Sequence, residues 1–174
     1  MDAAAGAVRI RRATRDDDLA ALRTAFTTDV VYDVVRTRNG FALRERAVSP
    51  PLRKRYDLPE RAPGETVLVA DDDGVLAGVA VYRVARWNRR GELLHLYVDR
   101  RRRGRGVGRA LLDEVVERVR AAGARALWLE TQNVNAPAIR FYRRYGFRLA
   151  GLDDSLYDPD ELPGEVALFF ALEF

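Results

Sequence analysis

The chain contains no cysteine, a single histidine and a single methionine. Without cysteine, disulfide bonds, thiolate metal ligands and a cysteine nucleophile are excluded, and nothing requires an oxidising compartment. One histidine, His95, cannot build a multi-histidine site, so no metal is predicted, although counting leaves an all-carboxylate site open. No apolar run approaches the roughly 20 residues of a membrane helix, and residues 1–8 lack the pattern of a signal peptide. These absences favour a cytoplasmic protein with no membrane partner.

The size and charge of the chain set further bounds. A length of 174 residues is normal for one hydrophobic core, so residues 1–174 are predicted to form a single domain. The net charge of +4 is the difference between 30 basic and 26 acidic residues. Because the charges are nearly balanced, the net charge does not by itself predict a nucleic-acid partner. The local placement of the basic residues is more informative about binding.

The first half of the chain reads as strand, helix, loop and hairpin. A short strand at residues 8–12 is followed by Thr14, a plausible N-cap for a helix that continues through Leu19, Leu22 and Phe26. Residues 39–64 hold so many turn formers that they are predicted as a loop region that could shape a substrate pocket. Residues 66–70 and 75–84 are β-rich and flank an Asp-Asp-Asp-Gly turn, which predicts an antiparallel hairpin.

The second half alternates strands and helices, which indicates an α/β layer with a parallel crossover. Apolar residues at helical spacing predict a helix that Gly123 ends. A second helix is predicted from its N-cap Asn135 and its stop Gly146. The predicted elements are a strand at 93–98, a helix at 107–122, a strand at 126–130, a helix at 136–145 and strands at 147–150 and 166–172.

The densest basic segment, residues 100–109, is threaded with glycines and lies between an apolar strand and an amphipathic helix. Backbone N–H groups at the start of that helix can point at an anion, and glycines let the backbone approach it closely. A Rossmann fingerprint would need glycine at Arg109, and a P-loop would need a Gly-Lys-Ser/Thr run that is absent. The alternative is a solvated basic face or a nucleic-acid patch. The glycine spacing favours a phosphate-binding loop.

This loop, Arg103-Gly104-Arg105-Gly106-Val107-Gly108, resembles the Arg/Gln-x-x-Gly-x-Gly/Ala signature with which GNAT acetyltransferases grip the pyrophosphate of coenzyme A. A second block resembles the family's Asn-x-x-Ala…Tyr…Gly-Phe pattern through Asn135, Ala138, Tyr142, Gly146 and Phe147. The resemblance implies a mixed α/β fold in which helices flank a central mixed sheet of about six to seven strands, splayed at its middle parallel strands. It also implies acetyl-CoA as the cofactor, bound by Leu96, Val98, Arg103, Gly104, Arg105, Gly106, Val107, Gly108, Arg109, Asn135 and Tyr142.

Acetyl transfer to an amine needs a base, a donor for the developing oxyanion and a proton for the departing thiolate. Tyr142 matches the family's tyrosine near the thioester and is the predicted acid; the alternative is a half-buried helix tyrosine. His95 is the candidate base, because a neutral imidazole at pH 7 can accept a proton and strand periodicity puts it on the face of Tyr97. A core histidine is the alternative, and Glu92, Glu130 or a water chain could replace it as base. The resemblance assigns the oxyanion to the backbone N–H of Val98.

Four stretches, at residues 26–29, 40–45, 129–133 and 165–168, resemble streptothricin acetyltransferases within this family. Where an acidic Ile-Glu-Asp-Ile type of strand is expected in those enzymes, this chain has Leu-Leu-His-Leu at 93–96. The likeness implies a small cationic amine as substrate, with Asp29, Glu130 and Asp154 as carboxylates that could attract it.

Three other functions stay open from the sequence. The first is a protein lysine or N-terminal acetyltransferase, which the motifs do not separate from a small-molecule enzyme. The second is an arginine-rich nucleic-acid-binding module, which would bind DNA or RNA in a salt-sensitive way and ignore coenzyme A. The third is a GNAT-like sensor that binds coenzyme A without turnover. The oligomeric state is open as well, with a homodimer as one option.

Overall fold

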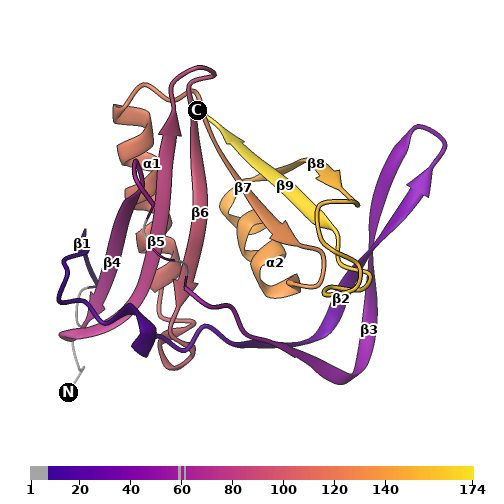
Figure 1. Ribbon diagram of the computed structural model, residues 1–174, viewed down its shortest axis with the longest axis horizontal. Coiled ribbons are helices and arrows are strands. Elements are labelled where there is room, and N and C mark those ends of the chain that lie inside the picture. Colours follow the sequence, from indigo (N-terminus) through magenta and orange to yellow (C-terminus); the bar gives the residue numbers. More distant parts are fainter. Residues whose placement is uncertain (1–7, 59, 61) are drawn as a thin grey trace. The chain divides into compact units, whose positions relative to one another are not determined.

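The predicted Asp-Gly hairpin is present in the computed structural model, which describes residues 8–58, 60 and 62–174 (Figure 1). Strand β4 (Thr66–Asp72) pairs antiparallel with β5 (Val75–Ala85). The two turn residues, Asp73 and Gly74, have φ of 57° and 75°. Positive φ at both central positions is what a two-residue hairpin turn of type I′ requires, and aspartate and glycine tolerate it better than most residues.

Nine strands occur among the described residues, and seven of them share one mixed sheet in the order β1-β4-β5-β6-β7-β9-β8. Strands β2 and β3 form a separate pair. Together with two α-helices this confirms the predicted mixed α/β fold. The chain divides into two compact units: the first holds the residues up to Ala25, Arg55–Leu127 and Phe174, and the second holds Phe26–Lys54 and Trp128–Glu173. A single domain, and a splay between the middle strands, stay predictions.

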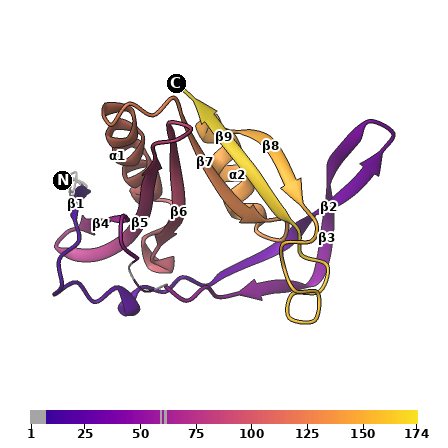
Figure 2. The same ribbon diagram turned by 45° about the horizontal axis from the view of Figure 1, so that its top comes forward.

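In the first unit, helix α1 (Val107–Ala121) lies against one face of β4, β5 and β6 (Arg90–Val98) in both ribbon views (Figures 1 and 2). Glycine permits the close approach: a Cβ at Gly78 of β5 would lie 2.8 Å from the carbonyl oxygen of Tyr97 and 3.0 Å from the Leu111 side chain. The opposite face carries a core cluster that includes Val79 and Val81 of β5. Strand β1 (Arg9–Arg12) pairs with β4 at the edge.

The second unit contains the remaining predicted elements. Strand β7 (Ala126–Gln132), whose first two residues belong to the first unit, leads to helix α2 (Ala136–Tyr145). As predicted, the Asn135 side chain accepts a hydrogen bond from the backbone N–H of Ala138 at 3.2 Å, and Gly146 ends the helix with a φ of 119°. Strands β8 (Arg148–Asp153) and β9 (Ala167–Glu173) pair antiparallel.

The helix predicted after Thr14 is wrong. Only a 3-10 turn, Leu19–Ala21, forms there, and Phe26 already begins strand β2. The segment makes tertiary hydrogen bonds in place of a helical ladder: the backbone N–H of Arg23 donates to Asp99 at 3.0 Å, and the Thr24 hydroxyl donates to the carbonyl of Tyr56. Periodic apolar residues therefore serve packing here without forming a helix.

The loop predicted over residues 39–64 is also wrong for its first part. Strand β3 (Gly40–Lys54) pairs antiparallel with β2 (Phe26–Thr37), and the pair has a register shift near Asp29. Residue pairing stops at Ala47 and resumes at Leu52, so both prolines, at 50 and 51, fall within the interruption. A proline has no N–H to donate, and a bulge in a two-stranded pair is a position where that loss is tolerated. Residues 59 and 61 of the predicted loop lie outside the described residues.

The described residues contain neither a candidate membrane span nor a candidate metal cluster. None of the helices in this part of the chain is long and apolar enough to cross a membrane. Within the same residues, no group of three or more histidine, aspartate or glutamate side chains is placed to hold a metal ion.

Candidate active site

The end of strand β6 presents backbone groups at its edge away from β5. The N–H of Asp99 donates to the carbonyl of Ala77 at 2.8 Å, which directs the backbone of Asp99 toward the β5 side. Because the groups of successive strand residues point to opposite edges, Leu96 and Val98 present their N–H and C=O groups on the other side. The Val98 carbonyl accepts a hydrogen bond from Nε of Arg103 at 3.2 Å. This orientation is the one that the predicted backbone contacts of Leu96 and Val98 require.

The phosphate-binding loop follows a 3-10 turn, Arg100–Arg102, and ends at the start of α1. Gly104 and Gly106 have φ of 78° and 84°, and a Cβ built on either would meet no atom within 4 Å. Gly106 is the N-cap of α1, and its carbonyl accepts the first helical bond, from Ala110, at 2.9 Å. The first N–H groups of a helix have no partner within the helix. Glycine conformation, open space and a helix N-terminus together fit a diphosphate.

Two arginine side chains of this loop form hydrogen bonds and ion pairs within the protein. The Arg103 guanidinium donates to the carbonyls of Val98 and Thr24, and burial lowers its pKa from the ordinary value. Arg105 lies 3.1 Å from Asp72, a carboxylate that also binds Arg102 at 3.0 Å. Side-chain contacts of these arginines with the cofactor stay a prediction. Arg109, also predicted to bind it, lies 3.7 Å from an aspartate one turn along α1 and is largely exposed.

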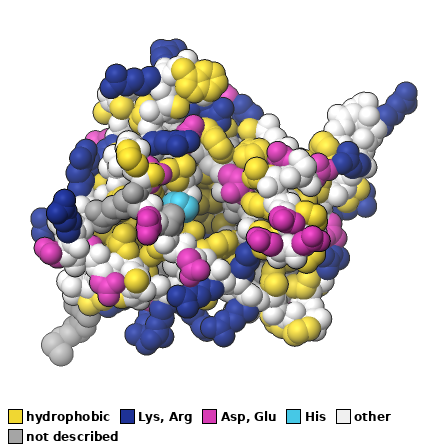
Figure 3. All heavy atoms as spheres, viewed as in Figure 1, with side chains coloured by type: hydrophobic (Ala, Val, Ile, Leu, Met, Phe, Trp, Pro, Cys, Tyr) yellow, Lys and Arg dark blue, Asp and Glu magenta, His cyan; other side chains and the backbone are white. Residues whose placement is uncertain are grey.

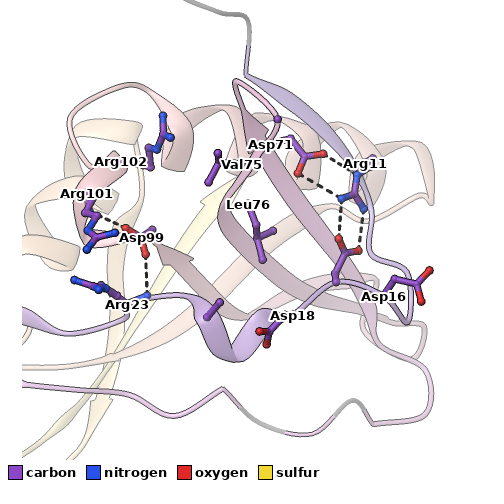
Figure 4. A pocket seen from close by; sticks show the side chains of 13 residues that line it. Arg11, Asp16, Asp18, Arg23, Asp71, Val75, Leu76, Asp99, Arg101 and Arg102 are labelled. Carbon is purple, nitrogen blue, oxygen red and sulfur yellow. Dashed lines mark hydrogen bonds and ion pairs between the residues drawn. The ribbon is translucent and has the colours of Figure 1, made fainter.

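Two carboxylates that support this loop were not singled out from the sequence. The side chain of Asp72 is almost fully buried, although its position in an Asp-Asp-Asp-Gly run indicated only a turn. Asp99 accepts from the N–H groups of Arg101 at 2.8 Å and Arg23 at 3.0 Å. Burial opposes the ionisation of Asp99, but these two donors hold its pKa below the ordinary value. Asp99 also lines an open pocket of about 490 Å³ that contains none of the predicted site residues (Figure 4).

His95 and Tyr97 lie on one face of β6, as predicted. Their rings stack at 5.8 Å between centroids, and Nδ1 of His95 is 3.5 Å from the Tyr97 hydroxyl. Leu94 forms a bulge in β6, because Leu93 pairs with Tyr82 of β5 and His95 pairs with Val81, which leaves Leu94 without an opposite residue. Desolvation lowers the pKa of His95, against a smaller upward effect of the Glu65 charge. The imidazole is therefore neutral at pH 7, and it reaches the molecular surface (Figure 3).

Tyr142 lies on α2 in the second unit and is 7% exposed. Its ring packs edge-on against Phe141 at 5.4 Å and against Phe147 at 5.6 Å between centroids. These two contacts involve the ring and not its hydroxyl group. Its roles as acid and as cofactor contact stay predictions, as does cofactor binding by Asn135, whose side chain caps the same helix.

The three predicted substrate carboxylates have different environments. Asp29 is exposed at the shift between β2 and β3, and Asp154 pairs with Arg36 on the surface. Glu130, on β7, is partly buried and accepts a hydrogen bond from the Tyr157 hydroxyl. Among the described residues, neither aspartate is hydrogen-bonded or ion-paired to Glu130. The structure therefore distinguishes Glu130 from the two surface aspartates.

An ion pair beside Glu130 was missed from the sequence. Nζ of Lys54, at the end of β3, lies 2.5 Å from each carboxylate oxygen of Glu165. Desolvation raises the pKa of Glu130, the Tyr157 hydrogen bond and the Lys54 charge lower it, and the Glu165 charge raises it. No motif marks these residues, because they come from a strand end and a loop that only folding brings together.

The chain is similar to known acetyltransferases in sequence and in structure. The Acetyltransferase (GNAT) family matches residues 32–147. Streptothricin acetyltransferase from Streptomyces lavendulae is 39% identical over 92% of this chain and 93% of its own length. The crystal structure of nourseothricin acetyltransferase is 45% identical, with a TM-score of 0.86, over 95% of this chain and 98% of that one.

A more distant structure shows the same fold. The putative streptothricin acetyltransferase from Bacillus anthracis, solved with acetyl coenzyme A, is 23% identical and has a TM-score of 0.82 over 97% of this chain and all of its own. The family match covers more than half of the chain and includes both of its sequence motifs. The chain therefore belongs to the GNAT acetyltransferase family, and it is an enzyme that takes its acetyl group from acetyl-CoA, as the sequence predicted.

Proposed function

We propose that this enzyme acetylates an amine of a small cationic antibiotic of the streptothricin type. The observation that carries the proposal is the 39% identity to a streptothricin acetyltransferase over nearly the full length of both chains. The nourseothricin acetyltransferase supports it with 45% identity and a matching fold. A cytoplasmic location and the oligomeric state stay predictions.

Bound acetyl-CoA would supply an acetyl group that is activated as a thioester. The residues of the first unit suit its binding, because the N–H groups at the start of α1 can hold the diphosphate. Gly104 and Gly106 keep that approach open, since no side chain projects from them. The backbone groups of Leu96 and Val98 can hydrogen-bond the extended arm of the cofactor, and the Val98 N–H is the proposed oxyanion donor.

Two side chains have proposed proton roles. The neutral imidazole of His95 can take a proton from the substrate ammonium, directly or through water, which leaves the neutral amine to attack the thioester; burial favours this role because it lowers the pKa of His95 from its ordinary value. The hydroxyl of Tyr142 can give a proton to the departing thiolate. Glu92, which the sequence left open as a base, is buried, and its carboxylate already forms an ion pair with Arg83.

Glu130 is the proposed receptor for a substrate ammonium group. Among the described residues, the only hydrogen bond to its side chain comes from Tyr157 to Oε1. In the part of the chain that the structure describes, every wholly buried side-chain oxygen or nitrogen has a hydrogen-bond partner. Because Oε2 of Glu130 has none, this atom is not wholly buried and keeps contact with solvent. An accessible oxygen on a partly buried carboxylate is suited to an ammonium ion. Asp29 and Asp154, both exposed, would contribute at most longer-range attraction.

A comparison of substrates tests the proposal. We expect kcat/KM for streptothricin to exceed that for a lysine peptide, a peptide N-terminus or a free polyamine by about tenfold or more at equal ionic strength. Equal salt matters because attraction between charges weakens as salt rises. A lysine peptide that is preferred by the same factor would instead support the protein acetyltransferase that the sequence left open.

A further inference from the structure

Lys54 is the single lysine of the chain; the other 29 of its 30 basic residues are arginine. Its position is not an ordinary surface site. The Lys54 and Glu165 side chains are 16% and 13% exposed, so their ion pair is largely shielded from water. Other ion pairs of the described chain are far more open, such as Arg46–Asp33 on the same strand pair at 56% and 41%. A shielded pair affects neighbouring charges more strongly than an exposed one.

The ion pair is connected to Glu130 through one loop. Glu165 and Tyr157 both lie in the segment between β8 and β9, and Tyr157 donates its hydroxyl to Glu130. The far end of the loop is tied to Asn133, the residue that follows β7. The N–H of Val166 donates to Oδ1 of Asn133 at 2.8 Å, and the N–H of Asn133 donates to the Val166 carbonyl at 3.0 Å. Lys54 thus holds the residue that immediately precedes this anchor.

We propose that Lys54 is a positioning residue for substrate recognition: its ammonium holds Glu165 and the β8–β9 loop so that Tyr157 occupies one oxygen of Glu130 and the other is left for a substrate ammonium. The inference rests on the proposed function in one respect, the role of Glu130 as receptor. Lys54 itself touches neither substrate nor cofactor in this account.

The charges of Lys54 and Glu165 should change the pKa of Glu130, which a purely structural role of the ion pair would not do. Within its unit, the titratable groups that act on Glu130 are Tyr157 and Glu165 of the loop and Lys54 of β3. Removing the Lys54 charge should raise the pKa of Glu130, because a nearby cation favours the ionised carboxylate. Removing the Glu165 charge should lower that pKa, because a nearby anion disfavours it. The two changes break the same ion pair but act in opposite directions.

The test compares pH profiles of kcat/KM for the amine. Glu130 must be ionised to hold an ammonium, so its protonation reduces kcat/KM as the pH falls. This loss at low pH is the acid limb of the profile. We expect Lys54→Met to shift the acid limb to higher pH by about one pH unit and Glu165→Gln to shift it to lower pH. The ionisation of the amine itself is common to all variants. Lys54→Met should raise KM for the amine about tenfold with KM for acetyl-CoA unchanged, and Lys54→Arg should keep the limb near its wild-type position.

Two controls separate this inference from the other claims. Arg46→Met removes an exposed ion pair of the same strand and should leave the profile unchanged. A ¹³C NMR titration of the Glu130 carboxyl in the amine-free protein, assigned with Glu130→Gln, needs no substrate at all. Opposite shifts in this titration support the role of Lys54 even where streptothricin is not acetylated. Shifts of the same sign, or none, would overturn it; if Lys54→Met does not fold, Glu165→Gln and Lys54→Arg decide.

Discussion

Gly106→Asp is expected to abolish the stabilisation that acetyl-CoA gives to the wild-type protein. A ligand that binds only the native state stabilises it by about 2.7 kcal/mol at a concentration 100 times its Kd, which raises the melting temperature. The new carboxylate would stand at the N-cap of α1, where the diphosphate is proposed to bind. Like charges at the same helix end would compete for the same N–H groups.

The structure offers a matched control for this variant. Gly74 also has a positive φ, 75° against 84° for Gly106, and a Cβ at either position meets no atom within 4 Å. Gly74→Asp therefore adds the same charge and a similar backbone strain at a hairpin turn. It should retain the full thermal shift with acetyl-CoA. If Gly106→Asp kept the wild-type thermal shift with acetyl-CoA, the loop would not be part of the cofactor site.

Tyr142→Phe is expected to lower kcat by about ten- to a thousandfold while the affinity for acetyl-CoA stays the same, as loss of a positioned acid predicts. The ring should stay in place, because its contacts with Phe141 and Phe147 do not involve the hydroxyl group. Steady-state kinetics and a thermal shift with acetyl-CoA measure the two quantities separately.

Tyr145→Phe removes the same group one helical turn later. Tyr145 is partly buried and packs on Phe147 at 5.8 Å, so its environment resembles that of Tyr142. The Tyr145 variant should keep wild-type kcat. Equal, small effects of both substitutions would return Tyr142 to a packing role and leave the acid unassigned.

Local chemistry explains why much of the fold was predictable. Asn135 and Gly146 mark the ends of α2 through a side-chain cap and a left-handed backbone, both of which short-range sequence determines. The Asp-Gly turn and the periodic apolar residues of α1 are signals of the same kind. The loop at Gly106 was predictable for the same reason, because its backbone conformation depends on glycine.

The missed features depend on contacts between distant segments. The prolines of β3 disfavour a strand locally, yet the pairing with β2 tolerates them where the register shifts. Asp72 forms ion pairs with Arg102, just before the phosphate-binding loop, and with Arg105 within it. Both arginines are about 30 positions away in the sequence, and no pattern links them to Asp72. Lys54 and Glu165 are likewise 111 positions apart. Such pairs carry no periodic or motif signal, so the sequence did not indicate them.

Acetyl transfer to the antibiotic is tested most directly by mixing the wild-type protein with acetyl-CoA and streptothricin, and by following thiol release together with the mass of the antibiotic. We expect free coenzyme A to appear in step with a streptothricin that carries one added acetyl group, and neither product to form without the protein. Acetyl-CoA that stabilises the protein, with no thiol release for streptothricin or any other amine, would contradict it and indicate a cofactor-binding protein without transferase activity.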